Sequence, residues 1–304
     1  MALHRLTTIT VGVPDVAAAA AFYREFGLAE RTPGTFETSA GGEQLRLLPA
    51  TRRGLVELGI GADDPDDLAR IARALDKLGV AASADGTALQ AVEPVTGLAI
   101  TVTITPRTSA PAAERVTCNA PGRIERANRP AEGVLRNDPV RPIKLSHVAI
   151  ASPDHEATIR FFTDGIGFAV SDRPAFGAFM RCSEDHHNLA VQMGPGTFLH
   201  HTAWEVADVD EVGRGGAAMV AADPSRHLWG LGRHAIGSNF FWYLCDPAGN
   251  FAEYVSDLDR ITDAGAYEPP MWAGPQMVRA WAPPMPPEFL APRDLGEVIG
   301  ELLS

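Results

Sequence analysis

Hydrophobic and polar positions follow the same order in two distant segments of the chain, residues 6–32 and residues 145–173. Each segment begins with an apolar stretch that predicts a strand, followed by a Pro-Asp pair that predicts the capped start of a helix. Each then carries an aromatic pair on the helix and a glycine that predicts where the helix ends. The two segments therefore predict one structural unit that occurs twice.

A second unit is also repeated, with weaker similarity. Residues 56–80 resemble residues 201–219, and a strand predicted at 93–102 corresponds to one predicted at 246–255. The chain therefore divides into four units, each made of a strand, a helix and several strands, in the order first, second, first, second. This order predicts an α+β protein with two domains.

The units also predict the domain boundaries. An N-terminal pair of units is expected over residues 1–107 and a C-terminal pair, which carries the chemistry, over residues 144–260. Between them, residues 108–143 contain prolines and charges without a clear period, as expected of a linker. Residues 261–304 form a tail rich in proline and aromatic residues, which ends in a short amphipathic helix, LGEVIGELL. We expect this tail to be a lid over a pocket or a contact between subunits.

Composition limits the class of partner. The 304 residues carry a formal net charge of -12 and contain no run of Lys or Arg, which argues against nucleic acid and against an anionic membrane surface. No apolar run approaches the length of a membrane span and the N-terminus lacks a secretory pattern, so a cytoplasmic location is expected. Cys118, Cys182 and Cys245 are widely spaced without a CxxC pair, which suggests neither disulfides nor a thiolate zinc site. The expected partner is a small molecule.

The two halves differ at three matched strand positions. Because both halves have the same predicted scaffold, the N-terminal half shows which residues the scaffold carries without these polar side chains. The matched pairs are His147 over Thr8, His201 near Val56, and Glu253 over Ile100. Two imidazoles and one carboxylate on three strands suit a divalent first-row metal with three open positions. Taken singly, His147 is better explained by strand packing and Glu253 by a solvent-facing position, and for His201 the two explanations are balanced. Their joint occurrence favours a metal site, for which the ligand types leave Fe(II), Mn(II), zinc and nickel open.

The motifs LSHVAI, HHTAW and DPAGNFAEYV resemble those of the extradiol (type I) ring-cleaving dioxygenases of the vicinal oxygen chelate superfamily. The resemblance covers residues 4–258 and is specific in residues 145–258. It implies four βαβββ units that form two domains of curled mixed β-sheet flanked by helices, the vicinal oxygen chelate fold.

The same resemblance implies roles for individual residues. His147, His201 and Glu253 are the implied metal ligands, and His200 is expected to pack or hydrogen-bond beside them.

Three further residues have implied catalytic roles. The segment SEDHHNLAV implies His187, rather than His186, as the acid and base, and GRHAIGSNFFWY implies His234 and Tyr243 beside the bound substrate. Taken singly, His234 also fits a loop cap, and Tyr243 also fits a core aromatic residue with a satisfied hydroxyl.

The implied reaction is the cleavage of an aromatic diol with O2 at Fe(II), with Mn(II) also compatible, to a muconic semialdehyde type of product. Some members that accept acidic catechols carry an arginine where this chain has Trp229, which favours a neutral or hydrophobic catechol. Phe179, Trp229 and Ile236 are the expected pocket walls, and each fits packing of the sheet equally well. The resemblance also implies a homo-oligomer.

Two alternatives share the same scaffold. One is a non-oxidative, metal-dependent lyase or isomerase of the glyoxalase fold, and the other is a metal-free binding protein of that fold, because fold alone does not decide function. Metal content and O2 uptake distinguish these alternatives from a ring-cleaving dioxygenase.

Overall fold

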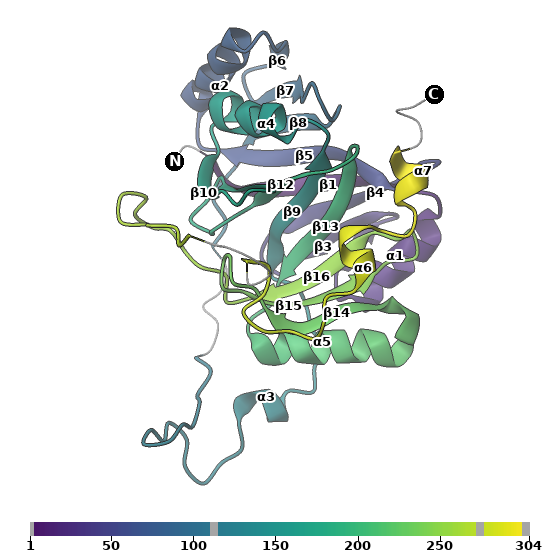
Figure 1. Ribbon diagram of the computed structural model, residues 1–304, viewed down its shortest axis with the longest axis vertical. Helices are drawn as coiled ribbons and strands as arrows, with labels where there is room; N and C mark the ends of the chain where they lie inside the picture. Colours follow the sequence, from purple (N-terminus) through teal and green to yellow (C-terminus); the bar gives the residue numbers. More distant parts are fainter. Residues whose placement is uncertain (1–2, 110–114, 272–276, 300–304) are drawn as a thin grey trace.

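The computed structural model describes residues 3–109, 115–271 and 277–299 and contains two eight-stranded sheets (Figure 1). The N-terminal sheet comes from two consecutive βαβββ units. The elements of the first unit are β1 (Leu3–Val13), α1 (Val16–Glu25), β2 (Ala29–Thr32), β3 (Thr35–Thr38) and β4 (Gly42–Pro49). Those of the second are β5 (Gly54–Ala62), α2 (Pro65–Lys77), β6 (Ala82–Ala84), β7 (Ala88–Val92) and β8 (Ala99–Ile104).

The C-terminal sheet repeats this order. Its first unit contains β9 (Lys144–Ser152), α4 (His155–Arg160), the π-helical turn η1 (Phe161–Ile166), β10 (Ala169–Asp172), β11 (Gly177–Arg181) and β12 (Leu189–Met193). Its second unit contains β13 (Phe198–Glu205), α5 (Val209–Ala222), the short 3-10 turn η2 (Pro224–Arg226), β14 (His227–Arg233), β15 (Phe240–Cys245) and β16 (Phe251–Ser256). The segment between the sheets carries the short helix α3 (Glu132–Leu135), and the tail carries α6 (Pro287–Leu290) and α7 (Leu295–Ile299).

Both sheets have the same strand order. It is β2-β3-β4-β1-β5-β8-β7-β6 in the N-terminal sheet and β10-β11-β12-β9-β13-β16-β15-β14 in the C-terminal sheet. In each sheet the first strands of the two units are antiparallel neighbours at the centre, and the last strand of each unit runs parallel to its first strand. Four βαβββ units in two mixed sheets confirm the predicted fold class.

The local patterns that predicted the units also explain how each helix begins and ends. All four unit helices begin at an aspartate whose carboxylate accepts a backbone N–H of the first turn, which satisfies one of the free donors there. These aspartates are Asp15, Asp64, Asp154 and Asp208. Gly27 and Gly167 follow the first helix of each half at φ of 99° and 100°, a left-handed conformation that glycine adopts without steric cost.

Aromatic packing joins the two halves. The rings of Phe26 and Tyr254 stack with centroids 3.9 Å apart and planes inclined by 2°, and the Tyr254 hydroxyl donates a hydrogen bond of 2.7 Å to the Phe26 carbonyl. Tyr254 follows Glu253 in β16 and points to the opposite face of the sheet. The N-terminal half therefore supports the back of the strand that carries Glu253.

The tail lies against the C-terminal sheet. Figure 1 shows the segment between the two sheets, with α3, looping away from the body of the molecule, while α6 lies beside β14 and β16. No helix in the described parts of the chain is long and apolar enough to cross a membrane.

We expect Phe26→Ala to lower the free energy of unfolding by about 3–5 kcal/mol, because it removes a buried ring at the contact between the halves. Tyr254→Phe, which removes only the hydroxyl, should cost about 1 kcal/mol. Urea denaturation measures both changes. Leu48→Ala, at a side chain that is 40% exposed, is the control and should stay within about 0.5 kcal/mol. A Phe26→Ala protein as stable as this control would contradict the role of the stack.

Candidate metal centre

Three neighbouring strands bring the predicted ligands together. β9, β13 and β16 lie side by side, and Ala203 of β13 is in register with both His147 of β9 and Glu253 of β16. Residues in register point to the same face, and His201 precedes Ala203 by two positions, so all three ligand candidates face one side of the sheet. The small side chain of Ala203 leaves the space between them free.

The ligand atoms of these residues converge. His147 Nε2 lies 3.2 Å from His201 Nε2 and 3.2 Å from Glu253 Oε2, and His201 Nε2 lies 3.6 Å from Glu253 Oε2. Three ligands bound at about 2.1 Å and at right angles around one ion would be about 3 Å apart. The three residues are 2%, 8% and 0% exposed. Glu253 Oε2 is buried without a hydrogen-bond partner, so the residues fit a divalent cation that would satisfy this oxygen.

His200 fixes the orientation of the His201 ring. The pairing of β13 with β9 shifts register between Leu199 and His201, and this bulge at His200 allows two successive rings to touch. His200 Nδ1 lies 2.7 Å from His201 Nδ1, and His200 Nε2 lies 2.7 Å from the Phe289 carbonyl. Burial lowers the pKa of His200 to about 4, so this ring is neutral at neutral pH.

A second histidine pair has the same arrangement. His187 Nδ1 lies 3.0 Å from His186 Nδ1, and His186 Nε2 lies 2.7 Å from Asp172 Oδ2 and 3.0 Å from the Tyr267 hydroxyl. Because the carboxylate accepts the His186 Nε2–H, His186 Nδ1 is the acceptor for His187 Nδ1–H, and His187 Nε2 keeps its lone pair. Burial, followed by the neighbouring His147, lowers the pKa of His187 well below its ordinary value. His187 is therefore a neutral base at the cavity wall, 4.2 Å from His147 between ring centroids.

His234 and Tyr243 form a hydrogen-bonded pair beside Glu253. His234 Nδ1 lies 2.5 Å from the Val278 carbonyl and His234 Nε2 lies 2.9 Å from the Tyr243 hydroxyl. The carbonyl can only accept, so the Tyr243 hydroxyl donates to His234 Nε2. Burial, followed by the Glu253 carboxylate, raises the pKa of Tyr243 well above its ordinary value, so this phenol stays protonated.

Five of these histidines and Tyr243 line one cavity of about 560 Å³, namely His147, His187, His200, His201 and His234. Apart from these residues, Gln192 and Asn239, its wall is largely apolar. Phe179 and Ile236, two of the predicted pocket residues, are in this wall, together with Phe176, Ala178, Met277, Val278, Met285, Phe289 and Leu290. A volume of this size suits a small aromatic molecule.

Trp229, the third predicted pocket residue, does not line this cavity. Its ring is 1% exposed and lies parallel to Tyr243, with centroids 6.0 Å apart, and it donates Nε1–H to the Pro283 carbonyl at 3.0 Å. β14 pairs with β15 so that Trp229 is opposite Tyr243. Trp229 therefore lies on the same face as Tyr243 but one strand further from Glu253, where it packs against Tyr243 and the tail, and the prediction that it forms the pocket wall is wrong.

The tail forms part of the cavity wall, and several polar residues hydrogen-bond to the groups around the cavity, beyond what the sequence patterns indicated. Met277, Val278, Met285, Phe289 and Leu290 close one side of the cavity. Asn239 Nδ2 lies 3.4 Å from Glu253 Oε1, and His186 relies on Asp172 and Tyr267. The proline and aromatic residues of the tail, from which we expected a lid or a subunit contact, were the indication of this role in the sequence. No periodic pattern tied the tail to the histidine strands.

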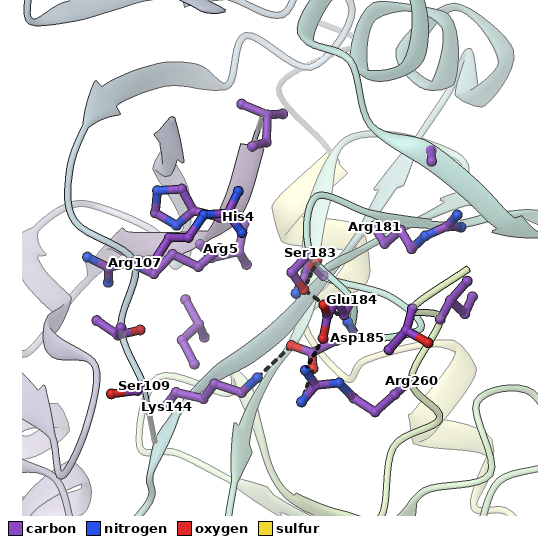
Figure 2. A pocket seen from close by; sticks show the side chains of 18 of the residues that line it. His4, Arg5, Arg107, Ser109, Lys144, Arg181, Ser183, Glu184, Asp185 and Arg260 are labelled. Carbon is purple, nitrogen blue, oxygen red and sulfur yellow. Dashed lines mark hydrogen bonds and ion pairs between the residues drawn. The ribbon is translucent and has the colours of Figure 1, made fainter. Parts of the chain in front are cut away.

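A second cavity, of about 690 Å³, lies where the two halves meet and has a different chemistry. Figure 2 shows His4, Arg5 and Arg107 on one side and Glu184, Asp185 and Arg260 on the other. Several of its charges are already paired: Lys144 Nζ lies 2.6 Å from Asp185 Oδ2 and Arg260 Nη2 lies 2.8 Å from Glu184 Oε2. The smaller cavity, with the three converging ligand atoms and an apolar wall, is the candidate active site.

Comparisons with known proteins agree with this geometry. The family model of the Glyoxalase/Bleomycin resistance protein/Dioxygenase superfamily matches residues 144–254. Metapyrocatechase 2 of Cupriavidus necator is 32% identical over 303 residues, which cover 95% of this chain and 92% of that protein.

Solved structures share the whole architecture. A Mn(II)-bound glyoxalase from Novosphingobium aromaticivorans superposes with a TM-score of 0.75 and 26% identity, covering 95% of this chain and 94% of that chain. The 2,2',3-trihydroxybiphenyl 1,2-dioxygenase of Sphingomonas wittichii strain RW1 superposes with a TM-score of 0.70 and 21% identity, covering 92% and 98%, and this likeness supports the fold alone. Identity to metapyrocatechase 2 along nearly the full length of both chains decides the family: the chain belongs to the extradiol ring-cleaving dioxygenases of the Glyoxalase/Bleomycin resistance protein/Dioxygenase superfamily.

Proposed function

We propose that this protein uses Fe(II) to cleave a neutral or hydrophobic catechol with O2, next to the diol, to a muconic semialdehyde type of product. The observation that carries the proposal is the convergence of His147 Nε2, His201 Nε2 and Glu253 Oε2 at the wall of an apolar cavity. Two imidazoles and one carboxylate leave open positions on a first-row metal, and Mn(II) is compatible with the same ligands. Bound Fe(II) would supply adjacent sites for the diol and O2 and a route for electrons between them.

The chain's own residues have distinct roles in this proposal. His187 Nε2 takes a proton from a catechol hydroxyl and later returns it to a reacting oxygen, because it is neutral and faces the cavity. When substrate binds, one of its hydroxyls can donate to His234 Nε2, and the Tyr243 hydroxyl, which then no longer donates to His234, can donate to a substrate oxygen. These two hydrogen bonds would hold the ring in one orientation. The apolar wall excludes water from the reacting atoms.

The apolar lining of the cavity favours a neutral or hydrophobic catechol as substrate. Phe179, Ile236 and the methionines of the tail offer no charge to a carboxylate substituent. Three arginines that are close in sequence to cavity residues are engaged elsewhere: Arg233 with Asp257 at 2.6 Å, Arg279 with the Pro283 carbonyl at 2.8 Å, and Arg181 with the Ser171 hydroxyl at 2.9 Å. A charged substituent would lose hydration without a partner. Catechols with alkyl or aryl substituents are therefore the expected substrates.

We expect protein reconstituted with Fe(II) without oxygen to consume one O2 per catechol and to form a yellow product. Alkyl- and aryl-substituted catechols should give a higher kcat/KM than carboxylated ones, because the lining is apolar. An oxygen electrode and absorbance spectroscopy measure both quantities. Tight binding of one metal per chain without O2 uptake across the panel would instead favour a non-oxidative enzyme of the same fold.

We expect Glu253→Ala to lose metal, because it removes the only anionic ligand of the site. Atomic absorption after loading with Fe(II) measures metal per chain. Glu93→Gln is the matched control, since Glu93 is a buried carboxylate of the N-terminal half that accepts backbone N–H groups of its own turn. Full metal content in Glu253→Ala would contradict the ligand assignment.

We expect His187→Ala to keep its metal and to lower kcat by about 10²–10⁴-fold, as expected for loss of a proton-transfer group. Steady-state O2 uptake and metal content, measured on the same sample, separate these effects. His227→Ala, at an exposed histidine that lies outside the wall of the metal cavity, should keep both. Undiminished turnover in His187→Ala would exclude this residue as the acid and base.

A further inference from the structure

The C-terminal segment supplies hydrogen-bond partners to two histidines that line the metal cavity, His200 and His234, and to His186, which contacts the lining residue His187. The Phe289 carbonyl contacts His200, the Val278 carbonyl contacts His234, and the Tyr267 hydroxyl contacts His186. Phe289 also inserts its ring, 6% exposed, beside His200, with centroids 4.8 Å apart. The segment is therefore in direct contact with the groups that orient the candidate ligands.

The Phe289 carbonyl determines which nitrogen of His201 is free. A carbonyl only accepts, so the neutral His200 ring donates its Nε2–H to Phe289 and offers Nδ1 as an acceptor. His201 must then donate Nδ1–H to His200, because the two Nδ1 atoms lie 2.7 Å apart. This leaves the lone pair on His201 Nε2, the atom that faces His147 and Glu253. One main-chain oxygen of the tail thus fixes the binding form of a residue in β13.

An ion pair from the other half of the molecule holds this part of the tail. Arg53, in the turn between β4 and β5, contacts both carboxylate oxygens of Asp294, at 2.5 and 2.8 Å. Its Nη1 donates to the Leu199 carbonyl at 3.1 Å, immediately before the histidine pair. The Arg53 side chain is 2% exposed and the Asp294 side chain 29%, so the arginine is shielded from water, and its two parallel N–H···O bonds fix the geometry of the pair.

We propose that seating of residues 287–294 and metal binding are coupled through His200, which is a positioning residue for His201. The Arg53–Asp294 pair keeps α6 in place, α6 presents the Phe289 carbonyl to His200, and His200 holds His201 with Nε2 toward the metal. The tail is therefore part of the metal centre as well as a wall of the cavity. His201 acts as a ligand in the proposed function, on which this inference rests, but ring cleavage is not required for it.

The first step of the proposal is that His200 holds His201 with Nε2 toward the metal. The affinity for Mn(II), which is stable in air, tests this step. We expect His200→Leu to weaken Mn(II) binding about 10–100-fold, the usual effect of losing a hydrogen-bond partner of a metal ligand. His200→Gln should restore most of the affinity, because its amide oxygen can accept from His201 and its amide N–H can donate to Phe289. Calorimetric titration measures both. Equal affinities of His200→Leu and the unmodified protein would overturn the role of His200, whereas an unmodified protein that binds no Mn(II) would overturn the metal site itself.

The second step is that the Arg53–Asp294 pair keeps α6, and with it the Phe289 carbonyl, in place. Substitution of this ion pair tests it. Asp294→Asn should weaken Mn(II) binding about fivefold or more, and Arg293→Gln, which alters a neighbouring side chain that is 88% exposed, should leave it unchanged. In the double variant His200→Leu/Asp294→Asn, the second substitution should add little, because its effect passes through His200. Fully additive losses would show that the tail acts by another route.

Hydrogen exchange on the unmodified protein provides a test that does not depend on the folding of a variant. Coupling is reciprocal, so Mn(II) should slow exchange of the Phe289 and Ala291 amides, which donate to the carbonyls of Pro286 and Pro287 at 3.1 Å. The same comparison in His200→Gln should show slowing, and in His200→Leu it should not. Exchange at these amides that is identical with and without bound Mn(II) would contradict the proposal.

Discussion

Two imidazole nitrogens and a carboxylate oxygen of three buried residues meet within 3.6 Å, and the surrounding structure has to hold these acceptors together. Acceptors without protons between them repel each other and lose hydration on burial, so a folded chain keeps such a cluster only where rigid elements impose it or a cation compensates it. Here the rigid element is the centre of a sheet. Ala203 lies between His147 and Glu253 in register, so strand pairing itself sets the spacing.

Orientation of the cluster depends on more distant groups. The pairs His186–His187 and His200–His201 share one hydrogen-bond arrangement. In each pair the first histidine donates its Nε2–H to an oxygen and accepts a hydrogen bond at Nδ1 from the second histidine. The second histidine, His187 or His201, therefore keeps a free lone pair at Nε2. The oxygens come from Asp172 in β10 and from Phe289 in the tail. The candidate base His187 and the candidate ligand His201 are therefore oriented by two elements that lie far apart in the sequence.

The N-terminal half has a supporting role. Its Ile100, at the position that matches Glu253, is buried at 1% exposure in the common core, and the half instead provides Phe26 behind β16 and Arg53 at the tail. At the matched strand positions, only the C-terminal copy of the scaffold carries the candidate ligands, and the N-terminal copy packs against it. The contacts from the N-terminal half reach the C-terminal sheet at β16, through Phe26 and Tyr254, and at β13, through Arg53 and Leu199.

Sequence patterns alone predicted the four repeated units, the helix starts at Asp15 and Asp154, and the set of histidines and one glutamate in the second half. These features depend on local propensity and on the comparison of one half with the other, and both can be read along the chain. The assignment of His147, His201 and Glu253 as ligands remains a proposal that their convergence supports. The resemblance to ring-cleaving dioxygenases added the family, which identity to a full-length relative supports.

Tertiary structure decided what local patterns could not encode. Trp229 was expected in the pocket wall, but the pairing of β14 with β15 places it beside Tyr243 and one strand further from Glu253. His200 meets His201 through a bulge that no hydrophobic period reveals. The contacts of Phe289 and Asp294 join residues separated by 89 and 241 positions. Register, bulges and long-range contacts depend on where distant segments dock. The sequence therefore predicted a lid or a subunit contact for the tail, and only the folded chain shows which of its described residues reach the histidines.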